Sequence, residues 1–189
     1  MVKQRKRESK IISALKSIIS TSLYLLMILA ITWFILTFLA QKTIVNGTSM
    51  ENTLYNGDHL IVDKISYRFK KPERFDIIVF PVEQSKKTYY IKRVIGLPGE
   101  TVRIDEKGII YIDNQELEES YGKEVIYSAG IANSEIALAT DEYFVLGDNR
   151  NDSSDSRDEK VGNIKKSNIL GKAWIRIWPF ESFGIMKHQ

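Results

Sequence analysis

The sequence contains no cysteine and only two histidines, His59 and His188, among its 189 residues. Without cysteine the chain has no disulfide framework, no thiolate zinc site and no cysteine nucleophile. Two histidines leave little for a histidine-based metal cage, so we predict no metal and no other cofactor. The length fits one domain, or one domain with a small insert.

Charge is absent from one long stretch near the N-terminus. Residues 1–16 carry six basic residues and one acidic residue, whereas residues 17–40 carry none of either sign. The remaining 149 residues hold a net charge of −2. The bulk of the chain is therefore slightly acidic, which argues against nucleic acid as a partner.

Residues 18–40 form a run of 23 uncharged residues, of which 18 are apolar. As a helix the run is about 35 Å long, enough to cross a hydrocarbon core of ~30 Å. A buried core helix is one alternative, but a core helix of this length rarely lacks a polar face. A cleaved signal peptide is another, but its apolar region is shorter, and Phe38 would occupy position −3 if Ala40 were −1. We therefore predict an uncleaved transmembrane helix over 18–40.

The positive-inside rule sets the orientation of this helix. The basic residues all precede the run, and Lys42 is the only charge close behind it. We predict a single-pass protein of the cell membrane, with a cytoplasmic tail over 1–17 and an extracellular domain over 41–189. The basic tail is interpreted as a topology signal rather than a binding site for anionic lipid or nucleic acid.

After residue 41, short apolar runs alternate with turn residues such as Asn56-Gly57-Asp58, and no stretch has a long helical period. This pattern predicts a mostly β fold, an antiparallel sheet domain preceded by one transmembrane helix. Residues 116–140 are the least regular part, where we expect an insert or a mobile subdomain. The predicted strands are 59–62, 75–82, 89–95, 101–104, 109–112, 143–146 and 173–178.

Two segments contain candidate catalytic side chains. The loop 46–50 places Ser49 among small residues, so a hydroxyl lies beside backbone amides that suit an oxyanion; Gly-Thr-Ser is also an ordinary turn. In the strand 89–95, Lys92 shares a face with Tyr90 and Val94. Burial between them would lower the pKa of Lys92 and make it a general base. The alternative is a lysine whose stem packs while its ammonium reaches water.

The third segment runs from Gly147 to Arg157 and follows the strand 143–146. It compresses acidic, amide and hydroxyl side chains against Arg150 and Arg157, so charge-assisted hydrogen bonds can hold the loop. A solvated polar loop and a calcium loop are alternatives, although the EF-hand spacing is absent.

Taken in order, the three segments resemble bacterial type I signal peptidases. That family has a serine and a methionine just beyond a membrane anchor, then a Lys-Arg strand ending in Gly-x-Pro-Gly, then Gly-Asp-Asn-Arg-x-x-Ser-x-Asp-Ser-Arg. The matching segments here are Ser49-Met50, residues 92–99 and residues 147–157, with every fixed position filled. The resemblance covers nearly the whole chain apart from 105–140, and the short single-span chain is similar to the Gram-positive branch.

The resemblance implies a role for each matching residue. Ser49 would be the nucleophile and Lys92 the general base, a Ser/Lys dyad without histidine. Ser153 would orient the lysine amine, and Asp155 and Arg157 would form a structural ion pair. Further positions would stabilise the fold around the site, and these are Arg93, Asp148 and Arg150.

Two residues match the substrate or oxyanion region of the family. Met50 would lie near the substrate pocket. Gly47 stands two residues before the nucleophile, where the Gram-negative pattern has a serine whose hydroxyl can help bind the oxyanion. The oxyanion hole would then depend on the Ser49 amide and on whatever Gly47 exposes.

The resemblance also implies a fold and a substrate. The fold is a β-sheet catalytic domain with a small β-rich insert, here at about 104–142. The partners would be the lipid bilayer and exported preproteins with small residues at −3 and −1, bound as an extended strand. Ser49 lies nine residues after Ala40, so at most ~30 Å of chain separates it from the predicted span.

Two rival hypotheses remain. A catalytically silent, membrane-tethered binding protein on the same fold would lack Ser49 or Lys92, and both are present. A Ser/His/Asp hydrolase would use His59, which begins an apolar strand after a turn, where a surface or structural role is more common. The C-terminal aromatic residues lie either at a lipid interface or in a core strand, and they are Trp174, Trp178, Phe180 and Phe183.

Overall fold

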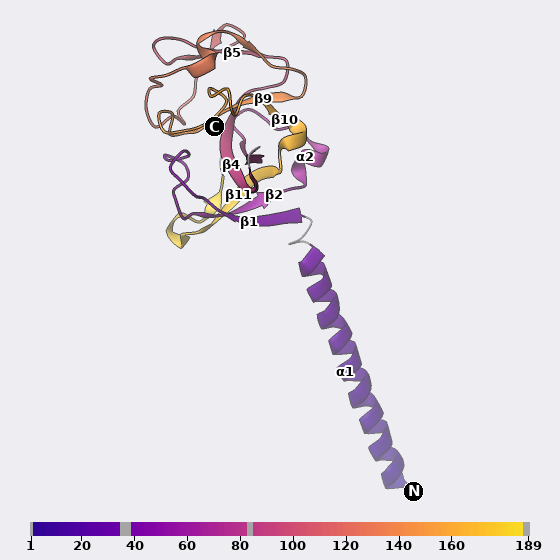
Figure 1. The fold of residues 1–189 in the computed structure, drawn as a ribbon. Coiled ribbons are helices and arrows are strands. Elements are labelled where there is room, and N and C mark those ends of the chain that lie inside the picture. The colour runs from indigo at the N-terminus through magenta and orange to yellow at the C-terminus, as the bar shows by residue number, and fades with distance from the viewer. Residues whose placement is uncertain (1, 35–38, 83–84, 187–189) are drawn as a thin grey trace. The chain divides into compact units, whose positions relative to one another are not determined.

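The computed structural model describes residues 2–34, 39–82 and 85–186. The chain divides into two compact units, residues 1–39 and residues 40–189. The first unit contains the helix α1 (Val2–Phe34), drawn in indigo and purple in Figure 1.

Helix α1 covers both the predicted basic tail and most of the predicted span. Its stretch from Ser13 to Phe34 is long and apolar enough to cross a membrane, and none of it is buried. Residues 35–38 of the predicted run lie outside the described residues. Ala40 does not end the helix but begins strand β1 (Ala40–Ile44), because its backbone pairs with Asp63.

The second unit contains an eight-stranded antiparallel sheet in the order β1-β2-β11-β3-β4-β9-β10, with β12 paired to β11 (Figure 1). A one-turn helix, α2 (Ser66–Phe69), follows β2. The remaining strands of this sheet are β2 (His59–Asp63), β3 (Ile77–Val82), β4 (Ser85–Gly96), β9 (Glu142–Leu146), β10 (Ile164–Lys165), β11 (Gly171–Trp178) and β12 (Gly184–Ile185).

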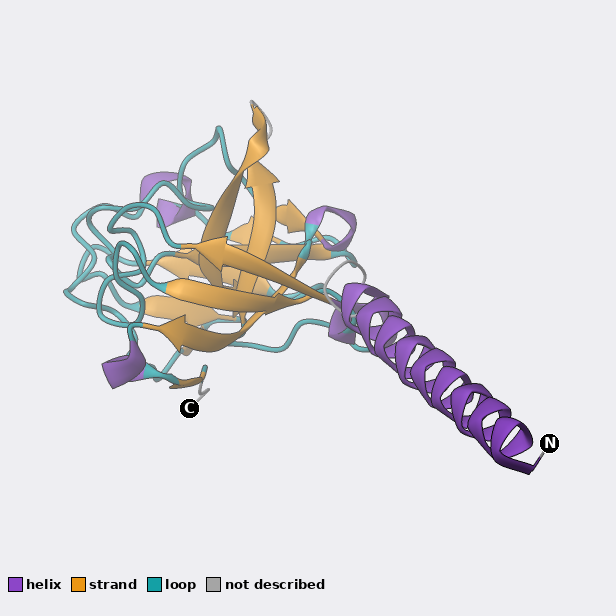
Figure 2. Cartoon of the chain, turned by 90° about the horizontal axis from the view of Figure 1, so that it is seen from below, coloured by secondary structure: helices purple, strands orange, loops and turns teal. Residues whose placement is uncertain are grey.

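A second, four-stranded sheet lies between β4 and β9 in the sequence. Its order is β7-β6-β5-β8, and its strands are β5 (Thr101–Ile104), β6 (Ile110–Ile112), β7 (Gln115–Glu116) and β8 (Ile136–Ala137). Figure 2 shows that strands dominate this unit and that the loops gather at one end of them. The prediction of a mostly antiparallel β fold is confirmed.

The predicted strands arise where apolar residues alternate. In β2 the side chains of Leu60 and Val62 are buried, while those between and beside them are half-buried. The sequence analysis missed five short strands, because two to five residues with mixed polarity carry too little periodicity to be recognised. These are β1, β7, β8, β10 and β12.

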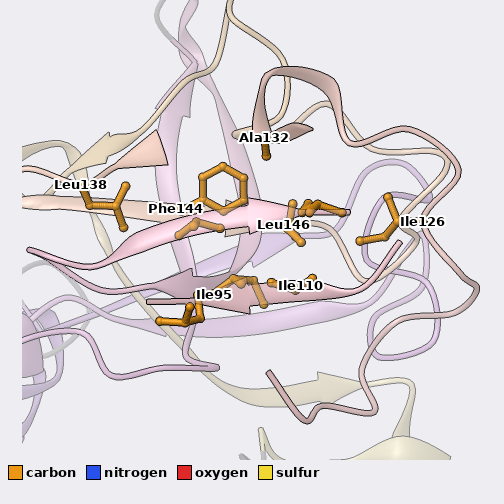
Figure 3. Close-up of a cluster of buried hydrophobic side chains, with 10 residues drawn as sticks. Ile95, Ile110, Ile126, Ala132, Leu138, Phe144 and Leu146 are labelled. Atoms are coloured by element: carbon orange, nitrogen blue, oxygen red, sulfur yellow. The ribbon is translucent and has the colours of Figure 1, made fainter. Parts of the chain in front are cut away.

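A shared hydrophobic core joins the two sheets (Figure 3). Ile95 on β4 and Phe144 and Leu146 on β9 pack against apolar residues of the second sheet. Gly96 permits this approach, because a Cβ there would lie 2.5 Å from the Val102 side chain. The insert is therefore packed directly on the strands that carry the candidate site.

Candidate active site

The geometry of the candidate site centres on one side-chain contact. Ser49 lies in the turn between β1 and β2, and Lys92 lies on β4. The Nζ atom of Lys92 donates a hydrogen bond to the Oγ atom of Ser49 at 2.7 Å. The contact joins residues 43 positions apart in the sequence, so it depends on the packing of the turn against β4.

Lys92 is buried, with 2% of its surface exposed. Its Nζ lies 5.1 Å from the centre of the Tyr90 ring, which shares its face of the strand. Burial lowers the pKa of Lys92 from 10.5 to about 8, although the carboxylates of Asp155 and Asp148 partly oppose the shift. A substantial fraction of this amine is therefore neutral near pH 8 and able to accept a proton.

Two buried ion pairs fix the loop 147–157 beside this contact. The guanidinium of Arg93 binds both carboxylate oxygens of Asp148, at 2.8 and 2.6 Å, and both side chains are fully buried. Arg157 binds Asp155 in the same two-point manner, at 2.8 and 2.9 Å. Asp155 also accepts a hydrogen bond from the Gly147 amide at 3.0 Å. Such bidentate pairs set orientation as well as distance.

Arg150 ties this loop to the insert. Its NH1 group lies 2.7 Å from Glu119, and its Nε donates to the Gly147 carbonyl at 3.0 Å. Arg157 reaches the same segment through the Ser128 carbonyl at 3.1 Å. The irregular part of the insert is thus fastened to the loop by buried arginines.

Three residues to which the sequence analysis gave no role hold the turn that contains Ser49. The amide of Asn149 donates to the Ser49 carbonyl at 3.1 Å, and its side chain donates to the Thr48 carbonyl at 3.2 Å. Thr48 in turn donates from its hydroxyl to Asp152 at 2.5 Å. No local pattern reveals contacts across about a hundred residues, so these roles became visible only in the folded chain.

Ser153 lies against the same turn. A Cβ added to Gly147 would stand 2.3 Å from the Ser153 Oγ and 2.4 Å from the Ser49 carbonyl oxygen, so only glycine fits there. The Ser153 hydroxyl is buried and makes no hydrogen bond within the described part of the chain. It borders the same groove as Lys92, but it does not bond to the lysine amine.

Gly47 and Met50 lie close to Ser49 in different environments. Gly47 adopts a φ of +100°, in the region that favours glycine, and its amide already donates to the Asn56 side chain at 2.9 Å. Met50 is 2% exposed and belongs to the hydrophobic core beneath the turn, where it also lines the groove. The Gly47 amide is therefore already engaged by Asn56.

His59 takes no part in this arrangement. Its ring packs beside Trp178, with the ring centres 6.4 Å apart, and it does not line the groove that contains Ser49. Trp178 and the other three C-terminal aromatic residues are not in the core, because 46% to 73% of each surface is exposed. Among the described residues, no group of three acidic or histidine side chains converges as a metal site.

Ser49 and Lys92 open onto a groove of about 620 Å³. One wall is the end of β1 with the turn that follows, and the other is residues 88–92 of β4. The loop residues 151–154 complete its lining. A serine hydroxyl, a partly neutral amine in contact with it and an adjoining groove together can support acyl transfer on a bound chain.

The family model and the sequence relatives of this chain point to the same family. Residues 18–178 match the family model described as signal peptidase, peptidase S26. A signal peptidase I from Leptolyngbya laminosa is 43% identical over 78% of this chain and 73% of its own. A signal peptidase I P from Bacillus subtilis subsp. natto is 33% identical over 95% of both chains. A crystal structure of a signal peptidase I from Enterococcus faecalis V583 is 36% identical, with a TM-score of 0.45 over 55% of this chain and 97% of that one.

Proposed function

The chain belongs to the signal peptidase family, peptidase S26, and on that premise we propose that it is a membrane-anchored serine endopeptidase that removes signal peptides from exported preproteins. Ser49 is the nucleophile in this proposal, and Lys92 is its general base. The observation that carries the proposal is the 2.7 Å contact between the two side chains. The lowered pKa of the buried lysine supports it.

The reaction proceeds in two steps. In the first, neutral Lys92 takes the hydroxyl proton of Ser49 while Oγ attacks the carbonyl carbon of the scissile bond. The tetrahedral intermediate collapses, Lys92 returns the proton to the leaving amine, and the signal peptide stays bound as an ester of Ser49. In the second step Lys92 deprotonates a water molecule, which attacks the ester carbonyl. The second tetrahedral intermediate collapses, Lys92 returns the proton to the leaving Oγ of Ser49, and the signal peptide is released with a new C-terminal carboxylate.

The oxyanion of each intermediate requires hydrogen-bond donors. The amide of Ser49 donates to no other described residue, so it is available as one of them. The amide of Gly47 is already bonded to Asn56. We therefore assign the backbone of the nucleophile turn, and not a hydroxyl at position 47, as the donor side of the site.

The groove suits an extended peptide. Among the described strands β1 pairs only with β2, and β4 pairs with β9 only from Arg93 onward. Two unpaired strand edges therefore border the groove, and an extended chain between them can bond to backbone groups. Its side chains at −1 and −3 would enter the groove on the same side, and the family resemblance adds that both are small.

The proposed function implies an order of segments along the chain relative to the membrane. Residues 1–17 form a basic cytoplasmic tail, and the apolar run that begins at residue 18 forms the membrane span, which includes α1 up to Phe34. The extracellular peptidase domain begins with β1 at Ala40 rather than at residue 41. Its inserted subdomain contains the whole second sheet and therefore begins before Thr101 rather than at about 104. The substrate's signal peptide is itself membrane-embedded, so an anchored enzyme meets the cleavage site without leaving the bilayer.

The test is cleavage by the purified full chain in detergent micelles. A preprotein with alanine at −3 and −1 should be cut after −1, as sequencing of the new N-terminus would show. The same preprotein with phenylalanine at −1 should remain intact. Ser49→Ala should abolish cleavage, whereas Ser134→Ala, at an exposed serine of the insert, should not. Binding of the preprotein without cleavage would instead favour a silent binding protein.

A further inference from the structure

Positive charge in residues 41–189 is concentrated in two segments that meet in the fold. Residues 64–71 and 165–172 together hold seven basic residues and no acidic one. The rest of this part of the chain has 14 basic and 23 acidic residues. The two segments lie against each other across a pocket of about 480 Å³, which we call the basic pocket.

The described residues that line the basic pocket include three cations and no carboxylate. Its cationic lining residues are Lys64 and Arg68, from the segment around α2, and Lys166, from the segment that precedes β11. The other polar lining residues with hydroxyl or amide groups are Tyr89, Ser167 and Asn168, while the hydroxyl of Tyr67 is bonded to Asp76. Three positive charges together with these neutral groups suit an anion with several oxygens, such as a phosphate.

Two acidic residues close to the basic pocket in the sequence or the fold have other partners. Asp76 is buried and engaged by Lys172 at 2.7 Å and by the Tyr67 hydroxyl at 2.7 Å. Asp63 accepts bonds from the amides of Ile65 and Ser66, which begin the turn into α2. Neither acid lines the basic pocket, and Lys64, Arg68 and Lys166 form no ion pair among the described residues, so these three cations are left to bind an external anion.

The basic pocket is connected to the membrane anchor by a short stretch of chain. Asp63 pairs with Ala40, the first residue of β1, and Lys64 follows it directly. Ala40 is six residues beyond Phe34, where α1 ends, so the covalent chain allows at most ~20 Å between those two residues. If α1 spans a bilayer, the basic pocket is therefore within reach of its headgroups.

One exposed aromatic side chain favours a lipid over a soluble phosphate. Phe69 ends α2 with 84% of its surface exposed, and basic residues Arg68 and Lys70 flank it. An exposed aromatic residue flanked by basic residues is typical of segments that insert into the surface of an anionic membrane. We propose that the basic pocket binds the phosphate of an anionic phospholipid, with Phe69 inserted beside the headgroup.

The experiment uses the full chain in nanodiscs of phosphatidylcholine, with or without about 30% phosphatidylglycerol. Because the chain has no cysteine, Ser167→Cys gives a single labelling site at the pocket. A fluorophore there should become about twofold less accessible to acrylamide, a neutral quencher, when the anionic lipid is present. High salt, about 0.5 M, should reverse the change. Co-elution of the protein with the nanodisc is a separate test of membrane anchoring, which is part of the proposed function.

Matched variants isolate the basic pocket. Lys64→Gln, Arg68→Gln and Lys166→Gln combined should abolish the effect, since each cation near an anionic surface contributes about fivefold in affinity. Arg103→Gln, Lys107→Gln and Lys160→Gln remove the same number and type of charges from outside the pocket and should preserve it. Circular dichroism should show that both triple variants fold.

Three results would overturn the proposal. The first is unchanged accessibility in the anionic nanodiscs. The second is equal loss of the effect in both triple variants, which would indicate attraction by overall charge. The third is the same protection by soluble glycerol phosphate in phosphatidylcholine nanodiscs, which would make the pocket a site for small phosphates rather than for lipid.

Discussion

Lys92 shows how its surroundings change the chemistry of one side chain. A free lysine is charged at neutral pH and cannot take a proton from serine. Burial lowers the pKa of Lys92 to about 8, which brings the neutral amine into the working range. The catalytic role that we propose for this residue depends on that shift.

We predict that Lys92→Arg loses at least about three orders of magnitude in kcat/KM, because a guanidinium stays protonated. In the unmodified enzyme, kcat/KM should rise about tenfold per pH unit below pH 8 and level off above it, as Lys92 loses its proton. Measurement of preprotein cleavage across pH tests both. Lys107→Arg, at an exposed lysine, serves as the control. Normal cleavage by folded Lys92→Arg, together with an inactive His59→Ala, would favour the histidine hydrolase.

The same shift predicts a stability change. The pKa of Lys92 is lower in the folded chain than in the unfolded chain, so holding its proton costs folding free energy below about pH 8. The cost disappears as the pH rises toward 10.5. Lys92→Met should therefore raise the free energy of unfolding at pH 7 by about 1–3 kcal/mol, and by less at pH 10. Denaturant unfolding at both pH values measures this, and a destabilised variant at pH 7 would contradict it.

Substitution of Gly47 is restricted by its backbone conformation rather than by contacts with neighbouring atoms. A Cβ there would meet nothing within 4 Å, but φ is +100°. We predict that Gly47→Ala and Gly47→Ser each lower the free energy of unfolding by about 1–2 kcal/mol and reduce cleavage to a similar extent. If Gly47→Ser cleaved about tenfold faster than Gly47→Ala, the added hydroxyl would be serving the oxyanion, contrary to our assignment.

At the scale of elements, the insert combines anchored and weakly bonded parts. Ile126 and Leu138 are buried in the shared core. In residues 117–130, which follow β7, several backbone amides bond to side chains or to loop carbonyls. The amide of Tyr127, for example, donates to the Asn151 side chain. Strand β4 is held instead by backbone ladders with β3 and β9.

We therefore predict faster amide hydrogen exchange in residues 116–130 than in residues 89–95 of β4. Mass spectrometry of exchanged peptides can compare the two segments in one sample. Glu119→Gln, which weakens the bond to Arg150, should increase exchange in the insert and leave β4 unchanged. Equal protection in the two segments would refute the expected mobility of the insert.

At the scale of the whole molecule, function depends on the side of the membrane on which the groove lies. The tail before the apolar run is strongly basic, whereas Lys42 is the only charge shortly after it. Exported preproteins present their cleavage sites on the outer side, so the proposed function requires residues 41–189 to lie there.

We predict that protease added to intact spheroplasts digests residues 41–189 and spares an N-terminal tag. The reason is the positive-inside rule applied to this single run. Immunoblotting for tags at each end gives the result, with a cytoplasmic protein as the control for intact cells. Protection of the C-terminal tag with loss of the N-terminal tag would reverse the topology.

How well the sequence predicted a feature depended on how far apart in the sequence the interacting residues are. The longer strands and the apolar helix follow from local periodicity, and they were predicted. The pairing of Arg93 with Asp148 was not, because it joins residues 55 positions apart. The support of the nucleophile turn by Asn149 was missed for the same reason.

The sequence by itself determined the apolar helix, the mostly β class and the order of the three motifs, because each is a property of neighbouring residues. Only the tertiary structure decided that Lys92 is buried and lies 2.7 Å from Ser49. It also decided that the Gly47 amide is occupied and that two basic segments about a hundred residues apart share a pocket. Burial and distance arise from packing between segments, and no local pattern of residues encodes them.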